Sequence, residues 1–291
     1  MDFELRRGEV HGLVGQNGTG KSTLMKIING VYTRDSGELA VSGQEAHHNT
    51  PTGAKAHGIA MVFQEFSLIP SITVVQNLFL SHERLKGLFV DEKPMREAAL
   101  RLFEDLEVDI DPDRLVSRLS VGERQVVEIA KAVSHHSSIL IMDEPTASLS
   151  GAEIQSLFKI IRRLKQDGIA VIFVSHHLNE VLEIFDRVTV IRDGIVALSK
   201  DIAATSMQEV ITAMIGNKFE RAQAVKEHRA ASNNPLLDVI GLSSGRYFQD
   251  ITFSVYSGEV VGIAGILGNG RSELFKAFYG ILPVDRGELH F

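Results

Sequence analysis

Residues 15–22 read Gly-Gln-Asn-Gly-Thr-Gly-Lys-Ser, which fits the pattern G-x-x-x-x-G-K-S. The stretch follows an apolar run at 10–14 and precedes a run with helical spacing at 22–28. A phosphate-binding P-loop requires this order of strand, glycine-rich loop and helix, so a chance glycine-rich turn is the poorer interpretation. The stretch therefore predicts an α/β fold in which this loop joins a strand to a helix.

The residue types of the loop suit a polyphosphate. Glycine lets the backbone approach the anion without an intervening Cβ, and the N–H groups of the loop and the helix start then face it. Lys21 is expected to reach the β- and γ-phosphates, and the Ser22 hydroxyl to bind Mg²⁺. The candidate nucleotide-binding residues of the loop are Gly15, Gln16, Asn17, Gly18, Thr19, Gly20, Lys21, Ser22 and Thr23.

Length and composition narrow the class of protein. The chain has 291 residues, 44% of them hydrophobic, which is enough for one large domain or two smaller ones. A net charge of −7 argues weakly against a nucleic-acid partner. We expect no transmembrane helix, since no apolar run approaches about 18 residues, and no signal peptide at the N-terminus. The chain has no cysteine, which excludes disulfides and thiolate metal sites, so a cytosolic compartment is expected.

The chain contains an internal repeat. Residues 1–41 align without a gap on residues 251–291, and sixteen of the 41 pairs are identical. The second copy stops at Phe291, and residues 236–250 have no counterpart before Met1. We therefore expect a piece of a tandem protein of roughly 500 residues, whose first copy lacks an initial strand.

The two copies of the loop differ at two positions. Lys21 corresponds to Arg271, and Thr23 corresponds to Glu273. Arginine keeps the positive charge but as a planar fork, and Glu273 adds a negative charge close to where phosphates would lie. The second copy is therefore either a structural remnant or a site that binds nucleotide and turns it over poorly.

Apolar strands alternate with helices along the first copy. This order predicts a mostly parallel sheet covered on both faces, with an antiparallel hairpin at 188–198. The predicted domains are 1–215 with a helical insert at about 67–137, a linker or solvated helix at 216–235, and the start of a second domain at 236–291. Strands are expected at 9–14, 37–41, 59–63, 139–142 and 170–174, and helices at 73–80, 95–106, 121–133, 152–165, 177–185 and 207–215.

Polar residues follow several of the predicted strands. Asp143 ends an apolar strand and can hold Mg²⁺, while Glu144 can act as the base that polarises an attacking water. Gln64 follows another strand and can bind Mg²⁺ and water, although a surface glutamine is the better reading of that residue alone. His176 also follows a strand and could donate to a γ-phosphate. Alone, each of these residues is weak evidence.

The segment 119–125, Leu-Ser-Val-Gly-Glu-Arg-Gln, opens a predicted helix. Taken alone, Ser120 is an N-cap that forms a capping box with Glu123. A functional reading is also open, because the N–H groups of the same helix start can bind a phosphate. Ser120 and Gly122 are therefore candidate nucleotide contacts.

The order of these motifs along the chain resembles that of the ATP-binding-cassette ATPases, over residues 1–215 and again over 236–291. The resemblance implies a P-loop NTPase cassette with a helical insert, followed by the start of a second cassette, with ATP and Mg²⁺ as cofactors. It implies that Glu144 is the catalytic base and His176 the switch histidine, and that Ser120 and Gly122 belong to the signature motif. Ser150 replaces the usual D-loop aspartate, and the expected adenine-stacking aromatic would precede Met1.

The altered second loop is similar to that of bacterial monosaccharide importers. This resemblance implies a peripheral subunit on the cytoplasmic face of the inner membrane that hydrolyses ATP to drive sugar transport. Its expected partners are integral membrane permease subunits, a second cassette and, indirectly, a periplasmic sugar-binding protein; nucleic acid is not expected. A soluble tandem ATPase, a nucleoside importer subunit and an ATP-binding piece without turnover remain alternatives.

Overall fold

The computed structural model describes residues 1–86, 89–134, 137–175, 183–216, 234–245, 247–265 and 269–291. The chain forms two compact units, Met1–Phe219 and Glu220–Phe291, and each is described by itself.

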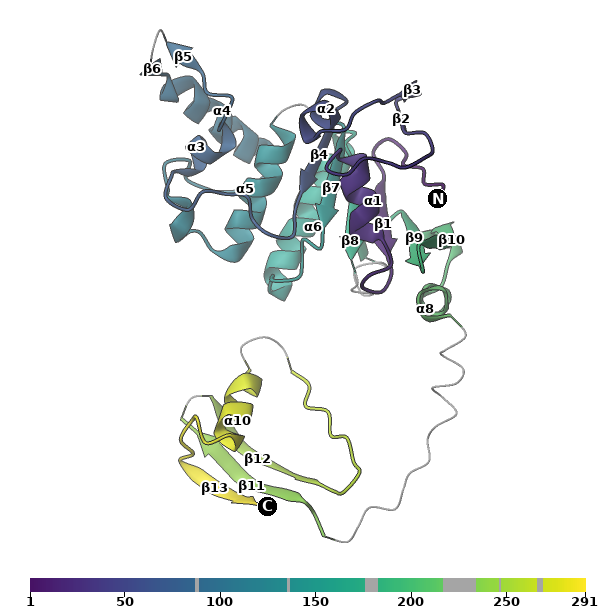
Figure 1. Cartoon of the computed structure of the whole chain (residues 1–291). Helices are drawn as coiled ribbons and strands as arrows, with labels where there is room; N and C mark the ends of the chain where they lie inside the picture. Colours follow the sequence, from purple (N-terminus) through teal and green to yellow (C-terminus); the bar gives the residue numbers. More distant parts are fainter. Residues whose placement is uncertain (87–88, 135–136, 176–182, 217–233, 246, 266–268) are drawn as a thin grey trace. The chain divides into compact units, whose positions relative to one another are not determined.

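A six-stranded sheet with the order β10-β9-β1-β8-β7-β4 forms the centre of the first unit (Figure 1). All neighbouring strands pair in parallel except β10, which is antiparallel to β9. The predicted mostly parallel sheet with an antiparallel edge is thus confirmed. The strands are β1 (Val10–Val14), β4 (Ile59–Val62), β7 (Ile139–Asp143), β8 (Ala170–Ser175), β9 (Arg187–Arg192) and β10 (Ile195–Asp201).

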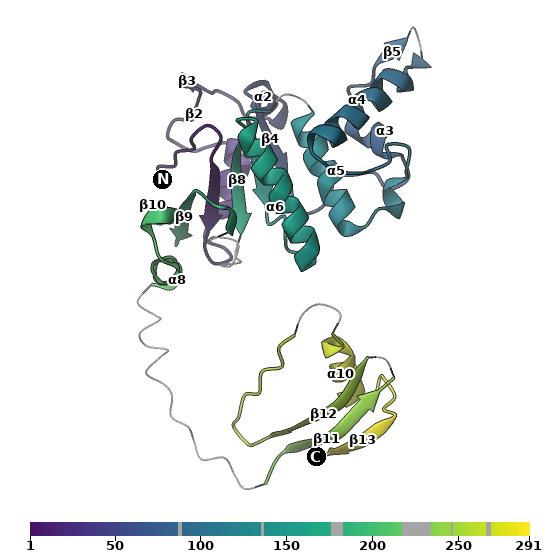
Figure 2. The ribbon, with the colours of Figure 1, turned by 180° about the vertical axis from the view of Figure 1, so that it is seen from behind.

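Successive residues of the central strands belong to two separate cores, because side chains alternate between the faces of a sheet. Ile141 and Ile172 pack with Met25 of α1 (Lys21–Ile28) in one core. On the other face, Phe173 lies in a larger core with Phe158 of α6 (Gly151–Gln166). Figure 1 shows α1 in front of the sheet, and Figure 2 shows α6 in front of it from behind. Burial on both faces explains the continuous apolar runs of these strands.

The predicted helical insert contains α3 (Val74–Leu78), α4 (Glu92–Asp105) and α5 (Val121–Val133). It also contains a short hairpin that the sequence did not predict, β5 (Leu85–Lys86) with β6 (Phe89–Val90). Every helix in the described part of the chain is too short or too polar to span a bilayer. The other elements of the first unit are β2 (Ala40–Val41), β3 (Gln44–Glu45), α2 (Pro51–Ala56), α8 (Met207–Ile215) and two 3₁₀ turns, Val116–Arg118 and Ile202–Ala204.

Two predicted elements are not found as the sequence predicts them. The strand expected at 37–41 is reduced to the two residues of β2, which pair with β3 and with no other strand in the described part of the chain. Most of the helix expected at 177–185 lies outside the described residues.

The second unit contains an antiparallel sheet with the order β12-β11-β13. Residues 260–264, which align with β1, form no strand, and Val260 is 96% exposed. In the first unit β1 pairs with β8 and β9, and the described part of the second unit has no counterpart of either strand. The two copies therefore share the helix that follows the loop but not the strand that precedes it. The elements are β11 (Leu237–Ser244), β12 (Phe248–Val255), α10 (Arg271–Phe278) and β13 (Arg286–His290).

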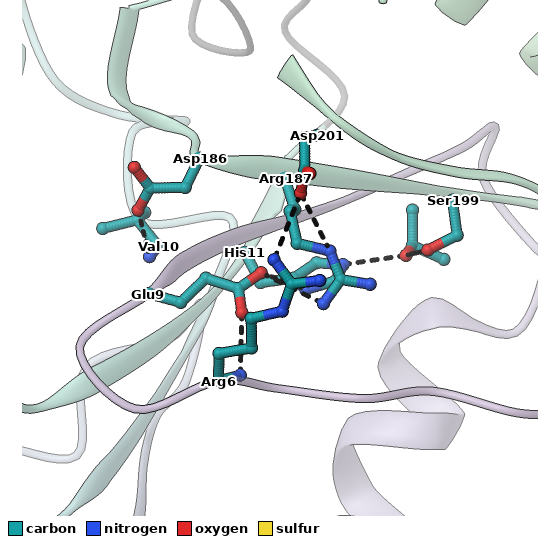
Figure 3. A network of polar contacts seen from close by, with 9 residues as sticks. Arg6, Glu9, Val10, His11, Asp186, Arg187, Ser199 and Asp201 are labelled. Atoms are coloured by element: carbon teal, nitrogen blue, oxygen red, sulfur yellow. Dashed lines mark hydrogen bonds and ion pairs between the residues drawn. The ribbon is translucent and has the colours of Figure 1, made fainter. Parts of the chain in front are cut away.

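A buried polar network at the amino end of β1 joins the N-terminal segment to β9 (Figure 3). His11 Nδ1 lies 3.0 Å from Glu9 Oε1, and His11 Nε2 lies 2.8 Å from Thr189 Oγ1. Arg187 Nη1 lies 3.6 Å from Glu9 Oε1, and the Arg6 backbone N–H donates to Glu9 Oε2 at 2.7 Å. Burial acts to raise the pKa of Glu9, but the contacts with His11, Arg6 and Arg187 outweigh it, so the pKa is lowered.

This network predicts an acid-sensitive contribution of Glu9 to stability. Because the folded-state pKa lies below the unfolded-state value, the contribution is complete above the unfolded value and is lost as pH falls through the folded value. Glu9→Gln should therefore lower the free energy of unfolding at neutral pH, and its deficit relative to wild type should shrink towards about pH 3. Urea unfolding at a series of pH values measures this, and a deficit independent of pH would contradict it.

Candidate nucleotide-binding site

The loop 15–22 lies between β1 and α1 and needs glycine for two reasons. Gly15 has a φ of 155°, and a Cβ there would lie 2.3 Å from the carbonyl oxygen of Ile191. Gly20, the N-cap of α1, is left-handed with a φ of 98°. Within the described residues no side chain caps α1, and no acidic residue stands in its first turn. The N–H groups of this helix start are therefore available to an anion.

Lys21 folds back over the loop. Its ammonium donates to the carbonyl oxygens of Gly15 at 2.8 Å and Gln16 at 2.9 Å, and the residue is only 5% exposed. Burial lowers the pKa of Lys21, while the charges of Glu144 and Asp143 act in the opposite direction. The ammonium is thus held at the loop by groups that a phosphate could replace.

The end of β7 meets the start of α1. Ser22 Oγ donates to Asp143 Oδ1 at 3.3 Å, and Asp143 is 7% exposed. Burial raises the pKa of Asp143, against the hydrogen bond from Ser22. A hydroxyl and one carboxylate beside a phosphate-binding loop fit Mg²⁺, which binds one or two carboxylates and completes its shell with water and phosphate oxygens. Among the described residues no cluster of three or more His, Asp or Glu suggests any other metal site.

Glu144 and Gln64 lie together although they are far apart in the sequence. Gln64 Nε2 donates to Glu144 Oε2 at 3.4 Å. Glu144 has a φ of 49°, which a non-glycine residue adopts rarely, and its N–H donates to the carbonyl oxygen of Val174 at 3.0 Å. Such a backbone at a strand end redirects the side chain and is typical of functional sites. The arrangement brings the amide of Gln64 to the carboxylate that directly follows Asp143.

Ser120 and Gly122 begin α5. The capping box predicted for Ser120 is present: its Oγ accepts from the Glu123 N–H at 3.1 Å, and its own N–H donates to Glu123 Oε2 at 2.7 Å. The Gly122 N–H donates to Glu153 Oε1 at 3.1 Å, and a Cβ at Gly122 would lie 2.6 Å from that oxygen. Ser120 thus bonds within the cap of α5, and Gly122 bonds to a side chain of α6. A contact of either residue with phosphate stays a prediction.

Glu153 was not among the residues predicted for the site. Glu153 also closes a capping box with Ser150 at the start of α6, so the pattern Ser-x-x-Glu at 150–153 could have indicated it. Its carboxylate joins the starts of two helices, and hydrogen bonds to Ser150 lower its pKa. His176 lies outside the described residues.

Comparisons with known proteins agree with this geometry. The profile of the ABC transporter family matches residues 1–147. A putative ribose/galactose/methyl galactoside import ATP-binding protein 1 from Agrobacterium fabrum is 43% identical over 291 residues, which cover 100% of this chain and 57% of the relative. A ribose import ATP-binding protein from Geobacillus kaustophilus is 41% identical over 292 residues, covering 100% and 59%. The chain thus spans somewhat more than half the length of these curated relatives.

Solved structures show the same fold. The chain resembles an ATP-binding cassette of an ABC transporter in its ADP conformation, with a TM-score of 0.65, 24% identity, and coverage of 78% of this chain and 91% of the other. A dimeric bacterial ABC transporter cassette gives a TM-score of 0.58 and 26% identity, covering 69% and 88%. Together with the profile match over half of the sequence, these similarities show that the chain belongs to the ABC transporter family of ATP-binding cassette proteins.

Proposed function

We propose that this chain binds and hydrolyses ATP to drive the import of a monosaccharide. The observation that carries the proposal is the convergence of two pairs at the end of the P-loop, Ser22 with Asp143 and Gln64 with Glu144. A carboxylate for a metal and a second carboxylate for a water are the groups that phosphoryl transfer to water needs. Relatives named for ribose and galactose import support a sugar as the cargo.

Each residue then has a distinct task. Lys21 and the first N–H groups of α1 bind the β- and γ-phosphates, and Ser22 with Asp143 and Gln64 holds Mg²⁺. When bound, Mg²⁺ neutralises charge that develops on the phosphate oxygens. Glu144 accepts a proton from the attacking water, and Gln64, which donates to its carboxylate, helps to orient that water. His176 is proposed to donate to the γ-phosphate.

The complete site is proposed to form between two cassettes. Ser120 and Gly122 of one cassette would contact the phosphates bound to residues 15–22 of another. A solved relative is described as a dimeric structure of a post-hydrolysis state bound to ADP and inorganic phosphate, which supports this assembly. The partners proposed for the transporter are integral membrane permease subunits and, through them, a periplasmic sugar-binding protein, with this chain on the cytoplasmic face of the membrane.

The role of Glu144 gives a direct test. Glu144→Gln is nearly isosteric, so the affinity for Mg-ATP should stay within about threefold, but the amide cannot accept the proton. Steady-state hydrolysis should fall about 10²- to 10⁴-fold. Glu104→Gln, an exposed substitution on α4, is the control and should leave both quantities unchanged. Hydrolysis near the wild-type rate in Glu144→Gln would exclude this residue as the base.

A site shared between cassettes also predicts how the rate depends on concentration. In the proposed assembly, the P-loop of one molecule faces Ser120 of a second molecule, so the site forms only when two molecules associate. Hydrolysis per mole of chain should therefore rise with protein concentration, and Ser120→Ala should weaken that rise. A specific activity that is constant with concentration, in a preparation shown to be monomeric, would contradict the shared site.

A further inference from the structure

Glu128 is a buried carboxylate that the tasks above do not use. It lies in the middle of α5 and is only 6% exposed. Both of its oxygens face one residue: Oε1 accepts from the Ser67 N–H, and Oε2 accepts from Ser67 Oγ at 3.1 Å. Lys131, one turn further along the helix, donates to the same Ser67 Oγ at 3.4 Å. A buried carboxylate is tolerated when it is hydrogen-bonded, and here Ser67 supplies both bonds.

Ser67 ends the segment that carries Gln64. The segment begins at Val62, the last residue of β4, which is buried and held in the sheet beside Met142 of β7. Between these two anchors the side chains of Phe63, Gln64 and Glu65 are exposed. Phe66, next to Ser67, is half-buried. Packing therefore does little to hold residues 63–65, and their position depends on the two ends of the segment.

Gln64 in turn contacts the proposed base, since its Nε2 donates to Glu144 Oε2 at 3.4 Å. A displacement of about 1 Å is enough to break a hydrogen bond of this length. If Ser67 lost its anchor on Glu128, Gln64 would lose a defined position relative to Glu144 and Asp143.

We propose that Glu128 is a positioning residue that, through Ser67, fixes Gln64 where it can bind Mg²⁺ and orient water. The inference rests on the proposed function. It assigns to the middle of α5 a role in the hydrolytic site, in addition to the phosphate contacts proposed for Ser120 and Gly122 at the start of that helix.

The test is the gain in ATP affinity that Mg²⁺ produces, measured by calorimetry on the full chain with ATP plus Mg²⁺ and with ATP plus a chelator. Glu128→Ala should reduce this gain about tenfold, the lower end of what the loss of a group supporting a metal ligand costs. ATP affinity in chelator should change less than about twofold, since the P-loop is untouched. Glu128→Gln keeps one acceptor for the Ser67 N–H and should recover most of the gain.

Two further variants separate positioning from general loss of structure. Gln64→Ala should reduce the gain as much as Glu128→Ala, and the double variant should be no worse than either alone, because both act on the same group. Asn77→Ala is the matched control: Asn77 is fully buried and bonds to the backbone of Ile69, two residues beyond Ser67. It should lower the melting temperature and leave the Mg²⁺ gain unchanged.

An unchanged gain in Glu128→Ala, or additive losses in the double variant, would overturn the proposal. If Glu128→Ala does not fold, Ser67→Ala removes the Oγ bond alone, and an undiminished gain in that variant would overturn it equally. Failure of the wild-type chain to bind ATP in chelator or in Mg²⁺ would instead contradict the proposed function itself.

Discussion

The candidate site depends on the parallel pairing of four neighbouring strands, β1, β8, β7 and β4. Parallel strands end at the same edge of a sheet, so whatever follows each strand gathers there. The register sets Val14 beside Ser175, Asp143 beside Val174, and Val62 beside Met142. The P-loop, the two acids and Gln64 are thereby brought together from three separate segments, with Ser22 and Asp143 121 residues apart and Gln64 and Glu144 80 residues apart.

Packing on both faces of the sheet holds this edge in place. One face of the sheet packs on α1, whose start binds the phosphates in the proposed function, and the other packs on α6. At the opposite end of β1, the buried Glu9–His11–Arg187 network ties β9 to the first strand. Charges buried there are tolerated because they are paired, whereas Lys21 and Asp143 at the site are buried with their pKa values shifted towards the neutral forms. The asymmetry is typical of a functional end and a structural end of one strand.

Much of the fold could be predicted because long elements carry strong patterns. The helices at 121–133 and 207–215 have the bounds predicted from their periodicity and caps. The hairpin of β5 and β6 could not be predicted, because strands of two residues have no period to detect. The repeat alone does not show that residues 260–264 form no strand, because a central parallel strand needs neighbours on both sides, and similarity to β1 cannot supply them. The sequence places Gln64 and Glu144 each after a predicted strand, but their contact depends on which strands are neighbours in the sheet. The anchor of Ser67 on Glu128 joins a loop to a helix interior, and no local pattern indicates it.

The most direct test of the central claim, that residues 15–22 with Asp143 hold a Mg-nucleotide, is equilibrium binding of Mg-ATP to the chain. Wild type should be compared with Lys21→Ala and with Arg271→Ala, the equivalent change in the second copy. Loss of the buried Lys21 ammonium should weaken binding about 10- to 100-fold, the range for a hydrogen bond to a charged group. Arg271→Ala should have a smaller effect. Equal losses in the two variants, or undiminished affinity in Lys21→Ala, would contradict the account.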